Sequence, residues 1–167
     1  MRRILGLSFA LVVLAAGAAL AASDDPGVPS SDDIQAIHDC LEASEGNAER
    51  QITIDCIGIV ANPCLDTPDG QTTPGMSACM LREETIWDGL LNDWYGMARE
   101  GMSRELKDQL RDVQRTWIDW RDAKCGFEHA KFEGGTAGGP AAAACLMETT
   151  AARALELRSL VLEFGEQ

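Results

Sequence analysis

The chain has 167 residues, with 14 basic and 27 acidic side chains that give a net charge of −13 at pH 7. This length corresponds to a single domain that can bury a core. So acidic a chain is a poor partner for nucleic acid or for anionic lipid, and its charge suits either a basic partner or simple solubility.

The first 22 residues have the pattern of a secretory signal peptide. Arg2 and Arg3 precede an apolar run over residues 4–20, and residues 19–21 form a small-x-small cleavage signal. We expect cleavage after residue 21 or 22, which leaves 12 basic and 27 acidic side chains and a net charge of −15. The cleavage point has no cysteine to accept a lipid, and the apolar run is short for a membrane span. A periplasmic or secreted protein of a bacterial envelope is therefore predicted.

The N-terminal part of the remaining chain predicts two short helices. Residues 23–30 are polar, contain two prolines and predict a flexible lead-in to one domain over residues 31–167. Ser31 suits the cap of a first helix, whose apolar face has helical spacing: Ile34, Ile37 and Leu41. A turn is expected over residues 45–47. The second helix ends near Asn62-Pro63 and carries three apolar residues: Ile52, Cys56 and Ile59.

A long third helix is expected over about residues 74–101. A loop over residues 65–75 precedes it, and Thr73-Pro74 suits its N-cap and first helical position. Large apolar residues supply its buried side: Met76, Met80, Trp87, Leu90, Leu91, Trp94 and Met97. Gly101 and Ser103 then mark a break and a new cap.

Two further helices complete the expected fold. The fourth, over about residues 104–126, has apolar residues at intervals of three and four: Leu106, Leu110, Val113, Trp117 and Trp120. A glycine-rich loop over residues 133–140 precedes a last helix over about residues 141–164, whose apolar residues are Leu146, Ala154, Leu157, Val161 and Leu162. Because no alternating run is long enough for a strand, we predict an all-α protein, a compact bundle of about five helices.

Six cysteines lie downstream of the leader: Cys40, Cys56, Cys64, Cys79, Cys125 and Cys145. In an oxidising compartment an even number of cysteines predicts three disulfides. Six cysteines allow 15 connectivities, and sequence alone does not choose between them. Geometry favours pairing in sequential order, because each such pair brackets a turn or a loop. Each bridge would then contribute about 3 kcal/mol in the chain-entropy description.

Other chemical uses of these side chains do not fit their spacing. No C-x-x-C pair occurs for a redox dithiol or a zinc ribbon, and no C-x-x-C-H occurs for haem attachment. The only histidines, His38 and His129, are isolated. Phosphate-binding and hydrolase motifs are also missing from the sequence. We therefore expect no metal and no cofactor.

Three blocks of residues between Cys79 and Leu157 resemble the secreted helical domain at the N-terminus of the lysozyme inhibitor LprI. The first block is Asp88, Leu91, Asn92 and Tyr95. The second block is Gln114, Trp117, Arg121, Asp122 and Cys125. The third block is Gly134, Gly135, Thr136, Cys145, Thr150, Arg153 and Leu157. The resemblance covers about half of the chain without its leader, and it implies a non-catalytic protein that blocks cell-wall hydrolases by protein–protein contact.

The second block predicts a polar network between helices. Gln114, Trp117, Arg121 and Cys125, spaced by three, four and four residues, share one face of the fourth helix, which should pack on the third and last helices. Arg121 on such a face needs a partner because an unpaired buried charge is costly, and Asp88 is the natural candidate. We interpret the network as structural rather than catalytic, with these members: Asp88, Asn92, Tyr95, Gln114, Trp117 and Arg121.

The third expected helix also carries Glu83, Glu84 and Asp88, the obvious candidates for a glycosidase-like acid–base pair. Nothing in the sequence places two of them across a cleft. We therefore interpret these carboxylates as part of a solvated helix face and predict no enzyme.

Two classes of function follow from these observations. A secreted inhibitor with this charge would be steered to the strongly basic surface that many lysozymes have. Its candidate partner-binding loops contain Asp66, Asp69, Gly70, Gly134, Gly135 and Thr136. The alternative is a cell-envelope enzyme or scaffold of unknown substrate. An enzyme would need a pocket with converging polar groups near Asp88, Tyr95 and Arg121.

Overall fold

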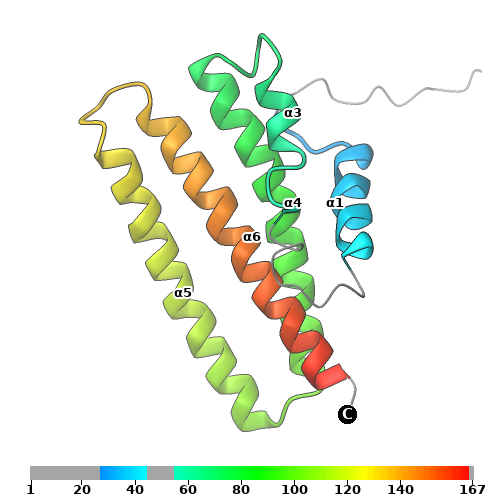
Figure 1. The fold of residues 1–167 in the computed structure, drawn as a ribbon. Coiled ribbons are helices and arrows are strands. Elements are labelled where there is room, and N and C mark those ends of the chain that lie inside the picture. Colours follow the sequence, from blue (N-terminus) through cyan, green and yellow to red (C-terminus); the bar gives the residue numbers. More distant parts are fainter. Residues whose placement is uncertain (1–26, 45–54, 166–167) are drawn as a thin grey trace, which may run out of the picture.

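The computed structural model describes residues 27–44 and 55–165 (Figure 1). These residues form five helices and no strand: α1 (Ser31–Ala43), α3 (Ala61–Leu65), α4 (Thr73–Glu100), α5 (Arg104–Ala130) and α6 (Gly138–Gly165). The predicted all-α fold is confirmed. The leader, the start of the lead-in, the expected turn at 45–47 and Ile52 lie outside the described residues.

The long helix α6 lies between the other two long helices (Figure 1). It packs along α4 over most of its length, and α5 packs on α6 from the other side, while α3 packs on α4. The main core lies between α1, α4 and α6, where Ile37, Trp87 and Leu157 are fully buried. This order leaves α5 as the outermost helix, on the opposite side of the molecule from α1.

Side-chain caps begin three of the helices. Ser30 caps α1 in a capping box, in which Asp33 N donates to Ser30 Oγ at 3.2 Å and Ser30 N donates to Asp33 Oδ2 at 2.6 Å. Thr72 caps α4 by accepting from Gly75 N at 3.0 Å. The predicted caps of these two helices were therefore each one residue late. Ser103 caps α5 as predicted.

The prediction of a second helix is wrong for the part of that segment that the structure describes. Residues 55–60 form turns, because Gly58 adopts a φ of 95° that side-chain-bearing residues rarely take. The short helix α3 begins only at Ala61 and continues through Pro63. Proline is tolerated there because backbone N–H groups in the first turn have no helical partner.

Three disulfides join these elements in sequential order. Cys40–Cys56 joins α1 to the turns before α3, Cys64–Cys79 joins α3 to α4, and Cys125–Cys145 joins α5 to α6. Their Cα–Cα distances of 5.9, 5.6 and 5.4 Å are those of ordinary disulfides. The pairing that geometry favoured is confirmed.

The apolar faces of the long helices are narrower than predicted. In α5, Leu110 is buried, but Leu106, Val113 and Trp120 are exposed. Met97 in α4 and Leu162 in α6, both expected in the core, are exposed as well. The physical reason in α5 is that this helix docks mainly on α6, so one neighbour covers one side of it. No helix in the described part of the chain combines the length and apolarity needed to cross a membrane.

Candidate functional site

A groove with a volume of about 320 Å³ runs between α4 and α5. All six members of the predicted polar network line it, together with two apolar and two basic side chains: Leu91, Ile118, Arg111 and Arg115. The structure therefore brings the predicted residues together. They line the two walls of a groove, whereas a packed contact between the helices was predicted. Their structural role stays a prediction.

The predicted ion pair between Arg121 and Asp88 is wrong. Arg121 Nη2 lies 2.9 Å from Asp122 Oδ1 on its own helix, and the guanidinium stacks over Trp117 with 5.1 Å to the ring centroid. Asp88 accepts instead from Asn92 Nδ2 at 3.0 Å, one turn along α4. Because α5 docks on α6, the groove separates the two helices that the pair would have joined.

The cross-helix hydrogen bond of this region comes from Arg153 of α6. Its Nε donates to Gln114 Oε1 at 2.9 Å, and its Nη1 lies 2.8 Å from Glu156 Oε2. Gln114 is buried, so this bond satisfies a polar group at the α5–α6 contact. Sequence reasoning gave Arg153 no role in the network. The sequence feature that could have indicated this role is the position of Arg153 on the apolar face of its helix, three residues after Thr150 and next to Ala154.

Glu84 is half-buried where α4 meets α6. Thr150, which is fully buried, donates its hydroxyl to Glu84 Oε1 at 3.3 Å. Burial raises the pKa of Glu84, and the negative charge of Asp88 one turn along adds to the rise. The Thr150 hydrogen bond and the positive charge of Arg121 act against it without cancelling it.

Glu83 is fully buried, and the expectation that it lies on a solvated face is wrong. Its Oε1 accepts from Gly58 N at 2.6 Å and from Trp87 Nε1 at 2.8 Å. Its Oε2 accepts from Val60 N at 2.9 Å and from Ala61 N at 2.8 Å. The carboxylate thus holds the turns before α3 against α4. The sequence feature that could have indicated this burial is the position of Glu83 four residues before Trp87, a core tryptophan.

The remaining carboxylates do not form a glycosidase-like pair. Glu84 and Asp88 are one turn apart on α4, so they lie on the same side of one helix, whereas a glycosidase places its two carboxylates on either side of the bond that it cleaves. Asp88 is the only acidic residue that lines the groove. In the described part of the chain, no group of three or more His, Cys, Asp or Glu side chains is arranged to hold a metal ion.

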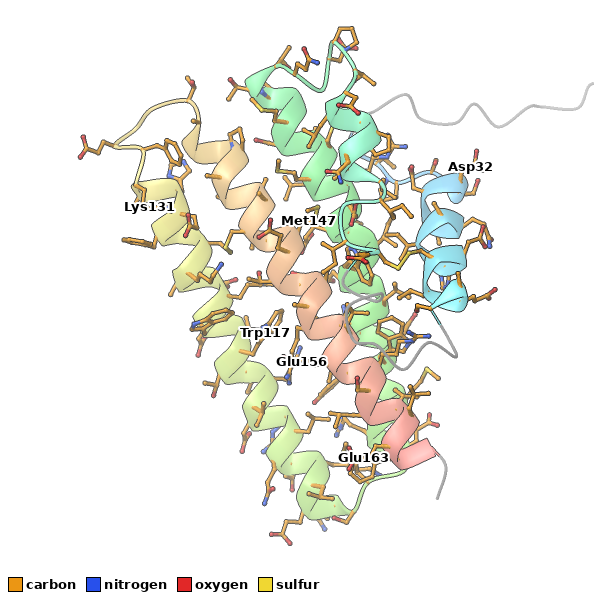
Figure 2. All side chains as sticks on the ribbon, viewed as in Figure 1. Asp32, Trp117, Lys131, Met147, Glu156 and Glu163 are labelled. Carbon is orange, nitrogen blue, oxygen red and sulfur yellow. A yellow bond between two sulfur atoms is a disulfide. The ribbon has the colours of Figure 1, made fainter. Side chains whose placement is uncertain are left out.

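The two candidate binding loops lie at the same end of the molecule (Figure 1). They span residues 66–72, before α4, and residues 131–137, before α6. The beginnings of these two helices are neighbours, since a Cβ on Gly139 would lie 3.5 Å from Ser77 Oγ. Figure 2 shows Lys131 at this end and Glu163 at the opposite end. We call this region the loop end.

Each loop of the loop end has a defined backbone. In the first, Gly70 is buried, and a Cβ there would lie 2.0 Å from the carbonyl oxygen of Cys64. Thr67 Oγ1 donates to that carbonyl at 2.7 Å and accepts from Gly70 N at 3.0 Å. In the second, Glu133 and Gly134 have successive positive φ values of 50° and 85°. A disulfide closes each loop, so both are anchored at their bases.

The exposed acidic side chains of the loop end are Asp66, Asp69 and Glu133. Its one basic side chain, Lys131, is already ion-paired with Glu128. The loop end therefore presents negative charge on a stapled framework.

Comparison with known proteins gives a family match. The family model described as lysozyme inhibitor LprI matches residues 64–157, which are 94 of the 167 residues. The matched range contains both loops, α4, α5 and most of α6. No curated protein and no solved structure matches the chain.

Proposed function

Because the chain belongs to the lysozyme inhibitor LprI family, we propose that it is a non-catalytic binding protein that blocks a lysozyme-type cell-wall hydrolase by direct contact. The leader over residues 1–22 would deliver it to the bacterial envelope, where its three disulfides are stable. In that compartment the protein would meet enzymes that act on the cell wall.

The observation that supports this function most directly is the loop end. Two loops from distant parts of the sequence lie at the same end of the bundle, each closed by a disulfide. Rigid loops lose little conformational entropy on binding, which is the general advantage of a pre-organised inhibitor. We propose that these loops enter or cover the substrate cleft of the hydrolase.

Charge supports the same partner. With Asp66, Asp69 and Glu133 exposed and Lys131 neutralised, the loop end attracts a basic surface, and the net charge of the whole chain acts in the same direction. Such complementarity mainly accelerates association and selects the partner. Inhibition should therefore weaken as salt rises, because exposed charges are screened beyond about 8 Å at physiological ionic strength.

A turnover assay tests the proposal. The purified, oxidised protein is titrated into a basic c-type lysozyme that is digesting a cell-wall suspension in low salt. We expect turnover to fall with added protein and to recover partly when salt is added. Unchanged turnover at micromolar excess in low salt would contradict the proposed function for this class of hydrolase.

The α4–α5 groove supports a second candidate, an envelope enzyme. It contains the converging polar groups that an enzyme needs, including Asp88, Tyr95 and Arg121. This candidate is tested by incubating the protein alone with peptidoglycan and measuring released fragments. Release that disappears in Asp88→Asn would favour the enzyme, and no release from the wild-type protein would count against it.

A further inference from the structure

The outward face of α5 carries a row of large apolar side chains. Leu106, Val113, Trp120 and Phe127 follow one another at intervals of seven residues, and they are 41, 51, 52 and 65% exposed. On an α-helix this spacing places all four on one side, in a stripe that turns by about 20° around the helix with each heptad. Single exposed apolar residues are common on protein surfaces, but an ordered line of four along one helix marks an interaction surface.

An acidic row runs beside the apolar row. Glu105, Asp112 and Asp119 each precede one apolar residue by one position, and all three are exposed. Asp112 pairs with Arg111 on the groove side at 2.9 Å, whereas Asp119 has no ion pair among the described residues. We call the apolar row and the acidic row together the α5 seam.

The opposite border of the α5 seam has two lysines. Lys124 lies over the Trp120 ring and Lys131 over the Phe127 ring, both at 5.9 Å from the ring centroid. Lys131 is ion-paired with Glu128, and Lys124 Nζ lies 3.3 Å from Cys145 Sγ, so both are held toward the protein. The side of the seam that faces solvent is therefore bordered by carboxylates.

No described element covers this surface. α5 docks on α6 with an adjacent side, which includes the buried Leu110, Gln114 and Cys125, and it is the outermost helix of the bundle (Figure 1). The row spans 22 residues, about 32 Å of helix at 1.5 Å per residue. That length matches an extended helix–helix contact.

We propose that the α5 seam docks a basic protein partner through an amphipathic helix whose apolar ridge is bordered by lysine or arginine. The partner's apolar side chains would pack between those of the row, as in two-helix coiled-coil contacts, and its cations would meet Glu105, Asp112 and Asp119. The α5 seam is distinct from the loop end, and the proposal does not require the partner to be a lysozyme.

Charge argues against two other occupants. A second copy of the chain, docked antiparallel by two-fold symmetry, would set one acidic row against the other. An anionic bilayer would face the same carboxylates and would be repelled by the net charge of the chain. With a basic amphipathic helix as partner, the apolar row packs on apolar side chains and the acidic row faces cations, so both rows of the α5 seam make favourable contacts.

Binding of a defined probe tests the proposal. The probe is a synthetic helical peptide with leucine at heptad positions and lysine beside them, and fluorescence anisotropy of the labelled peptide gives its Kd for the oxidised protein. The test variant is Val113→Ser with Trp120→Ser. The matched control is Met97→Ser with Leu162→Ser, which removes apolar side chains that are 52 and 59% exposed on other helices.

We expect the test variant to weaken peptide binding about tenfold or more and the control variant to leave it within about twofold. A second variant, Glu105→Gln with Asp119→Asn, leaves the apolar row intact and should weaken binding severalfold while lowering its salt dependence. Wild-type protein that does not bind the peptide, or a test variant that binds it as tightly as the wild type does, would overturn the proposal. Lysozyme inhibition is scored separately, so failure of the proposed function is recognised independently.

Discussion

The buried carboxylate of Glu83 accepts hydrogen bonds from four protein groups. Three of them are backbone N–H groups of Gly58, Val60 and Ala61, which have no helical partner of their own because they lie in the turns before α3 and at its start. The fourth is the indole N–H of Trp87. One carboxylate thus satisfies four buried donors and joins the turns before α3 to α4.

Glu83→Gln should destabilise the protein by about 3 kcal/mol, because the amide replaces an acceptor oxygen with a donor that faces buried N–H groups. The free energy of unfolding is measured by urea denaturation with the disulfides intact. Glu163→Gln, at an exposed position near the end of α6, serves as the control and should change this free energy by less than about 0.5 kcal/mol. Equal stability of the two variants would show that the buried hydrogen bonds of Glu83 are not needed.

Glu84 should make stability depend on pH in the opposite sense to an ordinary paired carboxylate. Its pKa is raised in the folded protein from an ordinary value of 4.5, so between the two pKa values the folded state holds the proton that the unfolded state has lost. The free energy of unfolding therefore falls as the pH rises through this window.

Glu84→Gln should abolish this part of the pH dependence and make the protein more stable than the wild type above the window. Thr150→Val, which removes the opposing hydrogen bond, should make the fall steeper. Urea denaturation at a series of pH values above 4.5 measures both effects. A Glu84→Gln profile that superimposes on the wild-type profile would contradict the assigned pKa shift.

At the residue scale, side-chain partners were harder to predict than positions. The spacings of three and four residues placed Gln114, Trp117 and Arg121 on one face of a helix, and the structure brings them to one groove with Asp88. They did not reveal that Arg121 reaches Asp122 or that Gln114 accepts from Arg153. Long flexible side chains choose between several acceptors within reach, and that choice depends on where a neighbouring helix docks.

The loop over residues 66–72 depends on a close backbone approach at Gly70. Gly70→Ala should destabilise the protein by about 1–3 kcal/mol, because its Cβ would lie 2.0 Å from the Cys64 carbonyl oxygen and would force the loop outward. The same displacement moves Asp69, so lysozyme inhibition should weaken as well. Thermal unfolding and the turnover assay measure the two effects.

Gly89→Ala is the matched control for this substitution. Gly89 lies within α4, and a Cβ there meets nothing within 4 Å, so alanine should stabilise the protein by about 0.5–1 kcal/mol. It should leave inhibition unchanged. If Gly70→Ala behaved like Gly89→Ala, the tight packing of this loop would be disproved.

At the element scale, helical periodicity predicted four of the five described helices, α1, α4, α5 and α6, to within a few residues at each end. It was misleading at Cys56 and Ile59, whose helical spacing is interrupted by Gly58 in a left-handed conformation. It also predicted that Val113 and Trp120 are buried, which they are not. Periodicity shows that a helix has an apolar face, but it does not show whether this chain or a partner covers that face.

The whole molecule separates its candidate surfaces. The stapled loop end, the α4–α5 groove and the α5 seam lie on different parts of one helical framework. The disulfides connect consecutive elements, so each constrains local geometry without closing a long loop. The order of the cysteines allowed this arrangement to be predicted, whereas the meeting of the two loops at one end depends on how α4 and α6 pack.

The central claim, that the loop end contacts a basic hydrolase, is tested most directly by the Kd for a basic c-type lysozyme. The test variant combines Asp66→Asn, Asp69→Asn and Glu133→Gln. The control combines Asp93→Asn, Glu100→Gln and Glu163→Gln, exposed residues of α4 and α6, of which Glu100 and Glu163 lie near the opposite end. Both variants change the net charge equally, so long-range attraction is matched.

We predict that the loop-end variant raises the Kd about tenfold, in line with the loss of three modest charge contacts, and that the control stays within about twofold of the wild type. A loop-end variant that binds as tightly as the control would contradict the claim.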